Sequence, residues 1–302
     1  MGSAPVVGLA LGRAVSVEGT GRGQDLIGIV TDSTADLPPT LAAEWGITVV
    51  PCLVNFGQET FREGVDLSHA EFYRRLESRS ELPTTSSPGP GVFAATYRRL
   101  AAETDQIVSL HLSSKLSGVY NSARLGAEQV EGMDIRMVDS GSVSMGLGWL
   151  TVMAARAARA GASLDKVVQL VEAAKRRVRV FALLDTLEYL RRGGRMNRLV
   201  AVLGTLLDIK PILCVEGGDV LPLARTRSRL KAESRLVSMI EELCPLAELA
   251  VLHSRALEAA EGLRDRLAAV FPRQHVVIAE VTTVLGTHVG PNALGAACVV
   301  AE

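Results

Sequence analysis

The stretch QIVSLHLSSKLSGVYNSA, residues 106–123, predicts a buried strand, a turn rich in hydroxyl groups and the start of a helix, in that order. The same order is predicted from LIGIVTDSTADLP, residues 26–38. Short apolar runs that alternate with helical patterns are typical of α/β domains whose sheet is largely parallel. The predicted fold class is therefore α/β.

The segments on either side extend this pattern. ITVVPCLVNFG, residues 47–57, is extended, and Pro51 marks an edge or a bend. DLSHAEFYRRLES, residues 66–78, has the spacing of an amphipathic helix. A long helical region covers roughly residues 146–177, with a break at Gly161. We expect this region to separate the first half of the chain from the second.

The second half has a stronger antiparallel signal. LLDIKPILCVEGGDVLPLARTRS, residues 206–228, predicts a hairpin that turns at residues 216–219. A mixed sheet is therefore expected in this half. The predicted organisation is a flexible N-terminal extension (1–25), an N-terminal α/β domain (26–146) and a C-terminal α/β domain (147–302).

Charge, cysteine spacing and the N-terminal stretch narrow the possible partners and location of the protein. The 302 residues carry a formal net charge of -1, which gives no reason to expect binding to nucleic acid. The four cysteines are far apart and form no CxxC pair, which favours free thiols and a cytoplasmic location over a disulfide framework or a zinc site. The apolar stretch near the N-terminus lacks preceding basic residues and is a poor signal peptide.

The common catalytic motifs are missing from the sequence. It contains no GxxxxGK[ST] phosphate loop, complete GxGxxG, HExxH helix or GxSxG nucleophile elbow. The five histidines do not lie at metal-ligand spacing from one another. No catalytic residue, metal or cofactor is therefore predicted.

Hydroxyl groups gather instead at predicted helix starts. Ser33 and Asp36 are expected to cap one helix, and Ser87 another, with Pro88 at its first position. These positions follow predicted strands, whose carboxyl ends meet at one edge of a parallel sheet. Most such residues are simple caps, but together they also suit a ligand.

Two hydroxyl-bearing segments are the candidates for that ligand site. One contains residues 84–86, and the other contains Ser113, Ser114 and Ser117. Helix N-termini offer free N–H groups and partial positive charge, which favour a single carboxylate or phosphate. The weakly polar surroundings suit a ligand whose other end is apolar.

Seven ordered segments resemble the DegV family of bacterial fatty-acid-binding proteins. The resemblance extends from about residue 27 to the C-terminus, and the order of the segments makes it specific. The segments are VTDSTADLP (30–38), TTSSP (84–88), LSSKLSGVYNSA (112–123), VDSGSVSMGLG (138–148), DTLEYLRRGGR (185–195), KPIL (210–213) and GTHVGPNALG (286–295).

The resemblance implies a fatty acid threaded between two α/β domains, with a lipid tunnel and a head-group site near their interface. By correspondence of motifs, Thr85 and Ser117 bind the fatty-acid carboxylate. Ser86, Arg195 and His288 are implied as further neighbours of the head group. Ser117 then needs no general base, because it attacks nothing.

Some relatives are the acyl-carrying subunit of fatty acid kinase. The resemblance therefore implies a separate ATP-binding subunit related to dihydroxyacetone kinase, formation of an acyl phosphate for phospholipid synthesis, and transient membrane contact for acyl exchange. RTRSRLKAESR, residues 225–235, is either a solvated helix start or a docking patch for such a subunit through Arg227 and Arg229.

Two other functions are compatible with the sequence. A serine-dependent acyl hydrolase or transferase would use Ser117 as nucleophile, with His288 or His111 as its base. A stand-alone lipid sensor or store would need no kinase. The chain also departs from the family pattern at two sites: Ser87 stands where many relatives have glutamine, and Asn292 replaces a usual glycine in a turn.

Overall fold

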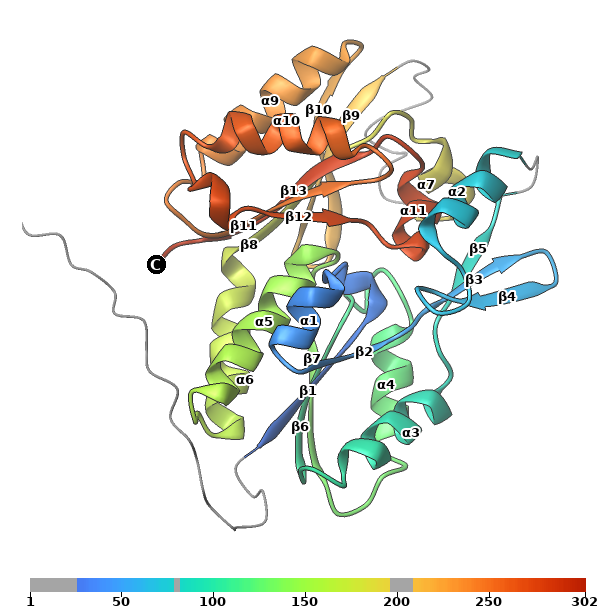
Figure 1. The fold of residues 1–302 in the computed structure, drawn as a ribbon, viewed down its shortest axis with the longest axis vertical. Coiled ribbons are helices and arrows are strands. Elements are labelled where there is room, and N and C mark those ends of the chain that lie inside the picture. Colours follow the sequence, from blue (N-terminus) through green and yellow to red (C-terminus); the bar gives the residue numbers. More distant parts are fainter. Residues whose placement is uncertain (1–25, 79–81, 196–208) are drawn as a thin grey trace, which may run out of the picture.

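The computed structural model describes residues 26–78, 82–195 and 209–302. The predicted flexible extension, 1–25, lies outside the described residues. Figure 1 shows two α/β halves, one above the other, each built around its own sheet. A mixed α/β fold, with one parallel and one mixed sheet, confirms the predicted class.

The first sheet is parallel and has the strand order β2-β1-β6-β7. Its central strands are apolar on both sides, because helices cover both faces. Ile29 packs with α5 and α6, whereas the next residue, Val30, packs with α3 and α4. The elements of this layer are β1 (Ile27–Asp32), β2 (Ile47–Val50), β6 (Gln106–His111), β7 (Asp134–Asp139), α1 (Pro39–Glu44), α3 (Pro90–Leu100), α4 (Val119–Ala127), α5 (Met145–Arg159), α6 (Leu164–Ala174) and the 3₁₀ helices η1 (Ser33–Ala35) and η2 (Lys175–Arg177).

A small antiparallel sheet projects from the first half and has the strand order β4-β3-β5. Two of its strands, β3 and β4, form the light-blue hairpin at the right of Figure 1. Its elements are β3 (Leu53–Phe56), β4 (Glu59–Arg62) and β5 (Thr84–Ser86), and α2 (His69–Ser78) lies between β4 and β5 along the chain.

Both predicted caps are wrong. Residues 84–86 form strand β5, and α3 begins at Pro90 after Gly89 rather than at Ser87. Proline is well tolerated at a helix start, where its missing N–H has no partner to lose. Likewise, α1 begins at Pro39 with no side-chain cap. The Ser33 hydroxyl instead accepts a hydrogen bond from a backbone N–H of residue 52.

The second sheet is mixed and has the strand order β10-β9-β8-β13-β11-β12. Only β11 and β12 pair in parallel among its described strands. The predicted hairpin is confirmed: β9 and β10 pair in antiparallel fashion and turn at Gly217 and Gly218, which both have positive φ. The elements of this half are β8 (Val178–Leu183), β9 (Lys210–Glu216), β10 (Asp219–Thr226), β11 (Leu246–His253), β12 (Val277–Glu280), β13 (Leu294–Val300), α7 (Glu188–Arg192), α9 (Arg229–Glu241), α10 (Leu257–Leu267), α11 (Thr283–Val289) and the 3₁₀ helix η3 (Arg273–His275).

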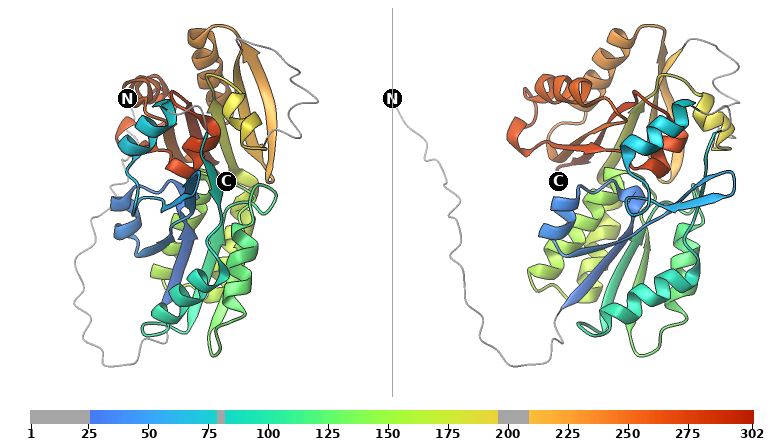
Figure 2. Two further views of the ribbon diagram at one scale, coloured as in Figure 1. Left: turned by 90° about the vertical axis from the view of Figure 1, so that its right-hand side faces the viewer. Right: turned by 45° about the vertical axis from the view of Figure 1, so that its right-hand side comes forward.

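Helix α5 joins the two halves. It packs against β1 of the first sheet and against β8 and β13 of the second, and one apolar core runs through all of them. The Trp149 indole N–H donates to the carbonyl of Ala297 at 3.2 Å. Figure 2 shows the two halves from two further directions. The division between residues 146 and 147 stays a prediction; it falls within the first turn of α5, and α6, the next helix, packs on the first sheet.

A buried carboxylate also connects the halves. Asp36 has φ of 51° and accepts hydrogen bonds from the Ser144 hydroxyl, at the start of α5, and from the Thr282 N–H, at the start of α11. Its side chain therefore fastens the turn after β1 to two helices instead of capping α1. This contact fixes α11 relative to the first sheet.

Candidate ligand-binding site

A cavity of about 220 Å³ lies between the two halves. One wall consists of turns that follow the parallel strands β1, β6 and β7, in agreement with the general position of ligand crevices in such sheets. The opposite wall is formed by the second sheet and by α11. Much of the lining is aliphatic, including Leu112, Leu116, Val180, Leu213, Val215 and Val289.

All five residues predicted at a head group line this cavity: Thr85, Ser86, Ser117, Arg195 and His288. They come from four separate segments of the chain. Thr85 Oγ1 lies 2.9 Å from His288 Nε2. The structure thus brings the predicted positions to one place, and their roles toward a ligand stay predictions.

The pairing of β5 with β3 orients Thr85. In a strand, successive side chains point to opposite faces, so Thr85 points away from its neighbour Ser86. The Ser86 hydroxyl accepts a hydrogen bond from the Asn55 amide at 3.3 Å. Thr85 is consequently free to meet His288, whereas Ser86 already has a partner on the small sheet.

His288 is neutral near pH 7. Burial, with a smaller effect from the positive charge of Arg195, lowers its pKa to about 4. Its Nδ1 is buried and has no hydrogen-bond partner among the described residues. Because a buried N–H without an acceptor is rarer than a buried acceptor without a donor, we assign the proton to Nε2. Nε2–H then donates to Thr85 Oγ1, and the Thr85 hydroxyl hydrogen is left to donate to a third group.

Two glycines allow α7 to lie directly against this histidine. A Cβ atom at Gly193 would fall 2.4 Å from His288 Nδ1, and one at Gly290 would fall 2.3 Å from the Tyr189 ring. The glycines of the GGR and HVGP segments therefore serve close packing of α7 on α11, which sequence reasoning missed. Arg195 follows at the exposed side, where its guanidinium donates to the Gly193 carbonyl at 2.7 Å.

The turn that carries Ser117 is held at its beginning. The Leu112 N–H donates to the Asp32 carboxylate at 3.1 Å, and the Ser113 N–H donates to the Ser142 carbonyl at 3.0 Å. Ser117 comes just before Gly118, the residue at the N-cap of α4. The first turn of α4 has no side-chain cap. Its N–H groups therefore have no side-chain acceptor at this end of the helix, which lies at the cavity.

His111 is engaged elsewhere. Its Nδ1 lies 2.9 Å from the Asp32 carboxylate and its Nε2 lies 2.7 Å from the Ser109 hydroxyl, and all three side chains are fully buried. Although burial acts to raise the pKa of Asp32, the hydrogen bond from His111 helps to hold it below its usual value. Both ring nitrogens of His111 are thus occupied, and Ser117 receives no base from it.

The two arginines of the predicted docking patch differ. Arg229 forms ion pairs with Asp185 at 3.0 Å and with Glu233 at 2.7 Å, so it anchors the start of α9. Arg227 is exposed and has no hydrogen bond or ion pair with another described residue. Of this pair, only Arg227 has a charge without a partner in the described part of the chain.

Other classes of site find no support in the described part of the chain. No cluster of three or more histidine, cysteine, aspartate or glutamate side chains there could hold a metal ion. The four cysteines are free thiols, as predicted, although Cys244 is only half-buried. No helix among residues 26–78, 82–195 and 209–302 is both long and apolar enough to cross a bilayer. Asn292 adopts φ of 61°, as its glycine-like position in the turn requires.

The fold and the cavity together define a class: α/β proteins with an apolar cavity between two sheets and hydroxyl groups at its wall. The family model described as "Uncharacterised protein, DegV family" matches residues 26–301, and the chain belongs to the DegV family. A DegV domain-containing protein of Halalkalibacterium halodurans is 39% identical over 89% of this chain and 96% of its own length.

Solved structures show the same fold. A fatty-acid-binding DegV family protein of Thermus thermophilus has 33% sequence identity and a TM-score of 0.84, over 91% of this chain and 100% of its own. DegV of Bacillus subtilis, described as a fatty acid binding protein, has 34% identity and a TM-score of 0.83, again over 91% and 100%.

Proposed function

We propose that this protein binds a long-chain fatty acid, with the carboxylate at Thr85 and Ser117 and the acyl chain along the aliphatic part of the cavity. The observation that carries the proposal is the position of both hydroxyls on one cavity whose wall is largely aliphatic. The descriptions of the Thermus thermophilus and Bacillus subtilis structures as fatty-acid-binding proteins support it.

The expected energetics fit this division of roles. Burying about 14 methylenes at roughly 0.8 kcal/mol each offers on the order of 11 kcal/mol before the costs of association. Each hydroxyl contributes about 1 to 3 kcal/mol toward a charged oxygen. The acyl chain would therefore supply most of the affinity, and the hydroxyls would fix the orientation of the head group.

The surroundings of Thr85 and Ser117 suit an acceptor-only ligand group. With His288 donating to it, the Thr85 hydroxyl donates outward. The uncapped first turn of α4 adds N–H groups and partial positive charge next to Ser117. Arg195 adds a full positive charge at the exposed side of the same cavity.

We further propose that the bound carboxylate is presented to a separate ATP-binding subunit related to dihydroxyacetone kinase. The absence of a phosphate loop from the sequence agrees with such a division of labour. Arg227 is then the better docking candidate, since Arg229 already holds α9. A cytoplasmic location and transient membrane contact for acyl exchange complete this proposal.

The geometry disfavours covalent catalysis by Ser117. His111 is occupied by Asp32 and Ser109, and His288 Nε2 lies against Thr85. The Ser117 hydroxyl has a serine partner, Ser87, at 3.4 Å. Since a nucleophilic serine needs a base within hydrogen-bond reach, non-covalent binding is the better account of this site.

Native mass spectrometry of the purified protein, followed by extraction after denaturation, tests the binding proposal. A non-covalent fatty acid at a ratio near one to one supports it, whereas protein that is empty and takes up no added fatty acid refutes it. Combined Thr85→Ala and Ser117→Ala substitution should impair acyl phosphate formation with a kinase subunit and ATP more than fatty-acid binding, because the acyl chain dominates affinity. Normal acyl phosphate formation by the double variant would contradict the head-group assignment.

A further inference from the structure

Ser87 lies at the head-group end of the cavity, although the family resemblance gives it no role. Its half-buried side chain lines the cavity, and its Oγ lies 3.4 Å from Ser117 Oγ. Gly118, the next residue after Ser117, is also close: a Cβ atom built there would be in ordinary contact with Ser87 Oγ, at 3.5 Å. The hydroxyl therefore sits against the start of α4, beside the proposed carboxylate site.

The Ser87–Ser117 contact is long for a pair of hydroxyls, which usually approach to about 2.7 to 2.8 Å. In such a pair one hydroxyl donates and the other accepts. An oxygen that only accepts, placed beside both, would receive a hydrogen bond from each. Together with the outward-donating Thr85, the site would then offer three donors from three side chains.

We propose that Ser87 is a third head-group hydroxyl and that it selects a carboxylate over an uncharged alcohol of the same chain length; this inference rests on the proposed fatty-acid binding. A carboxylate accepts at both oxygens and carries charge, so it gains from every donor. An alcohol has a single uncharged oxygen, so it gains less from three hydroxyl donors than a carboxylate does.

The test compares two ligands, hexadecanoate and hexadecanol, on delipidated protein by isothermal titration calorimetry. Ser87→Ala should weaken hexadecanoate binding about fivefold or more and hexadecanol binding by no more than about twofold, since hydrogen bonds to charged oxygens are the stronger ones. Ser87→Thr, which keeps the hydroxyl, should restore most of the selectivity. Ser122→Ala is the matched control, a half-buried serine on α4 that does not line the cavity.

The outcomes separate the two proposals. If wild-type protein binds neither ligand, the fatty-acid proposal fails, and this inference fails with it. If wild-type protein binds hexadecanoate but Ser87→Ala leaves the ratio of the two affinities unchanged, only the role of Ser87 is refuted. An equal loss for both ligands would show that Ser87 merely supports packing.

Discussion

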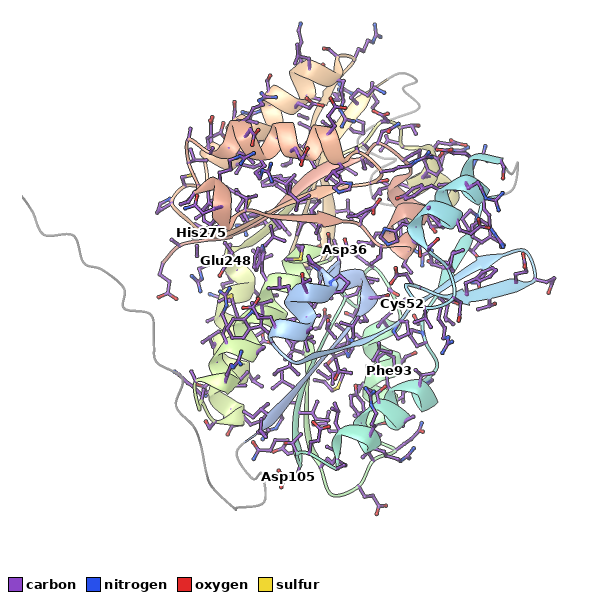
Figure 3. The ribbon with its side chains drawn as sticks, in the orientation of Figure 1. Asp36, Cys52, Phe93, Asp105, Glu248 and His275 are labelled. Carbon is purple, nitrogen blue, oxygen red and sulfur yellow. The ribbon has the colours of Figure 1, made fainter. Side chains whose placement is uncertain are left out.

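Replacement of Asp36 by asparagine should change how stability depends on pH. Asp36 is fully buried at the junction of the two halves, where Figure 3 labels it. Burial raises its pKa from 3.8 to about 7, although the hydrogen bonds from Ser144 and Thr282 act in the opposite direction. The folded protein therefore retains a proton that the unfolded chain releases at much lower pH.

The sign and size of the effect follow from this difference. The stability that the proton contributes is fully present below the unfolded pKa and is lost as pH rises through about 7. A shift of about three pKa units corresponds to roughly 4 kcal/mol over the whole range. Of this total, a loss of stability of about 2.5 kcal/mol is expected between pH 5 and pH 8, since some of the loss has already occurred by pH 5.

Urea unfolding of wild-type and Asp36→Asn protein at several pH values between 5 and 8 measures this contribution. Relative to wild type, the free energy of unfolding of the variant should rise by about 2.5 kcal/mol from pH 5 to pH 8. Asparagine does not titrate, and the contributions of all other groups cancel in the difference. Asp105→Asn is the control, at an exposed position far from the junction (Figure 3). A constant difference between wild type and Asp36→Asn would refute the buried-proton argument.

Two further perturbations test other contacts between segments. Hydrogen bonds to Glu280 and Glu63 raise the pKa of His69 to about 10, so His69→Gln should destabilise the protein by about 1 to 2 kcal/mol at pH 6, with the effect vanishing as pH rises through about 10. Thermal unfolding at both ends of that range checks this, and an effect of equal size at both would contradict it. Gly193→Ala should displace His288 and weaken fatty-acid binding about tenfold while preserving the fold, because the added Cβ would overlap the His288 ring. Unchanged affinity in a titration would show that the backbone around Gly193 moves instead of His288.

The sequence predicted the wall of the cavity better than its detailed geometry. The prediction for Ser117 depended on local order, because a turn after a parallel strand reaches the crevice whatever the rest of the fold does. The position of Thr85 could not be derived that way. TTS has no strong strand pattern, and it becomes β5 only because β3, far away in the sequence, offers an edge. Thr85 was therefore expected at the cavity for a partly wrong reason: it was predicted to lie just before a helix start, but it lies on a strand.

Contacts between distant segments account for most of what the sequence did not predict. The Gly-Gly pair before Arg195 indicated a break. In the fold, the absence of a side chain at Gly193 leaves room for the ring of His288, which is far away in the sequence. Ser87 was expected to be a cap and lies instead at the cavity beside Ser117. Glycine and serine are compatible with many local roles, so only the tertiary approach of their neighbours selects one.

Asp32 and Asp36 show most clearly why site chemistry needs the fold. They lie one turn apart in VTDSTAD, and both are buried. Asp32 faces His111 and several donors, which outweigh burial and lower its pKa, whereas Asp36 faces a hydroxyl and an N–H, which do not, so its pKa rises. The local sequence supplies only Thr34, which donates to Asp32. The other partners come from β6 and from the starts of α5 and α11, far away in the sequence. Protonation at this junction is thus a property of how the two halves meet, and a substitution that loosens the contact with Thr282 should move the pKa of Asp36 and leave that of Asp32 in place.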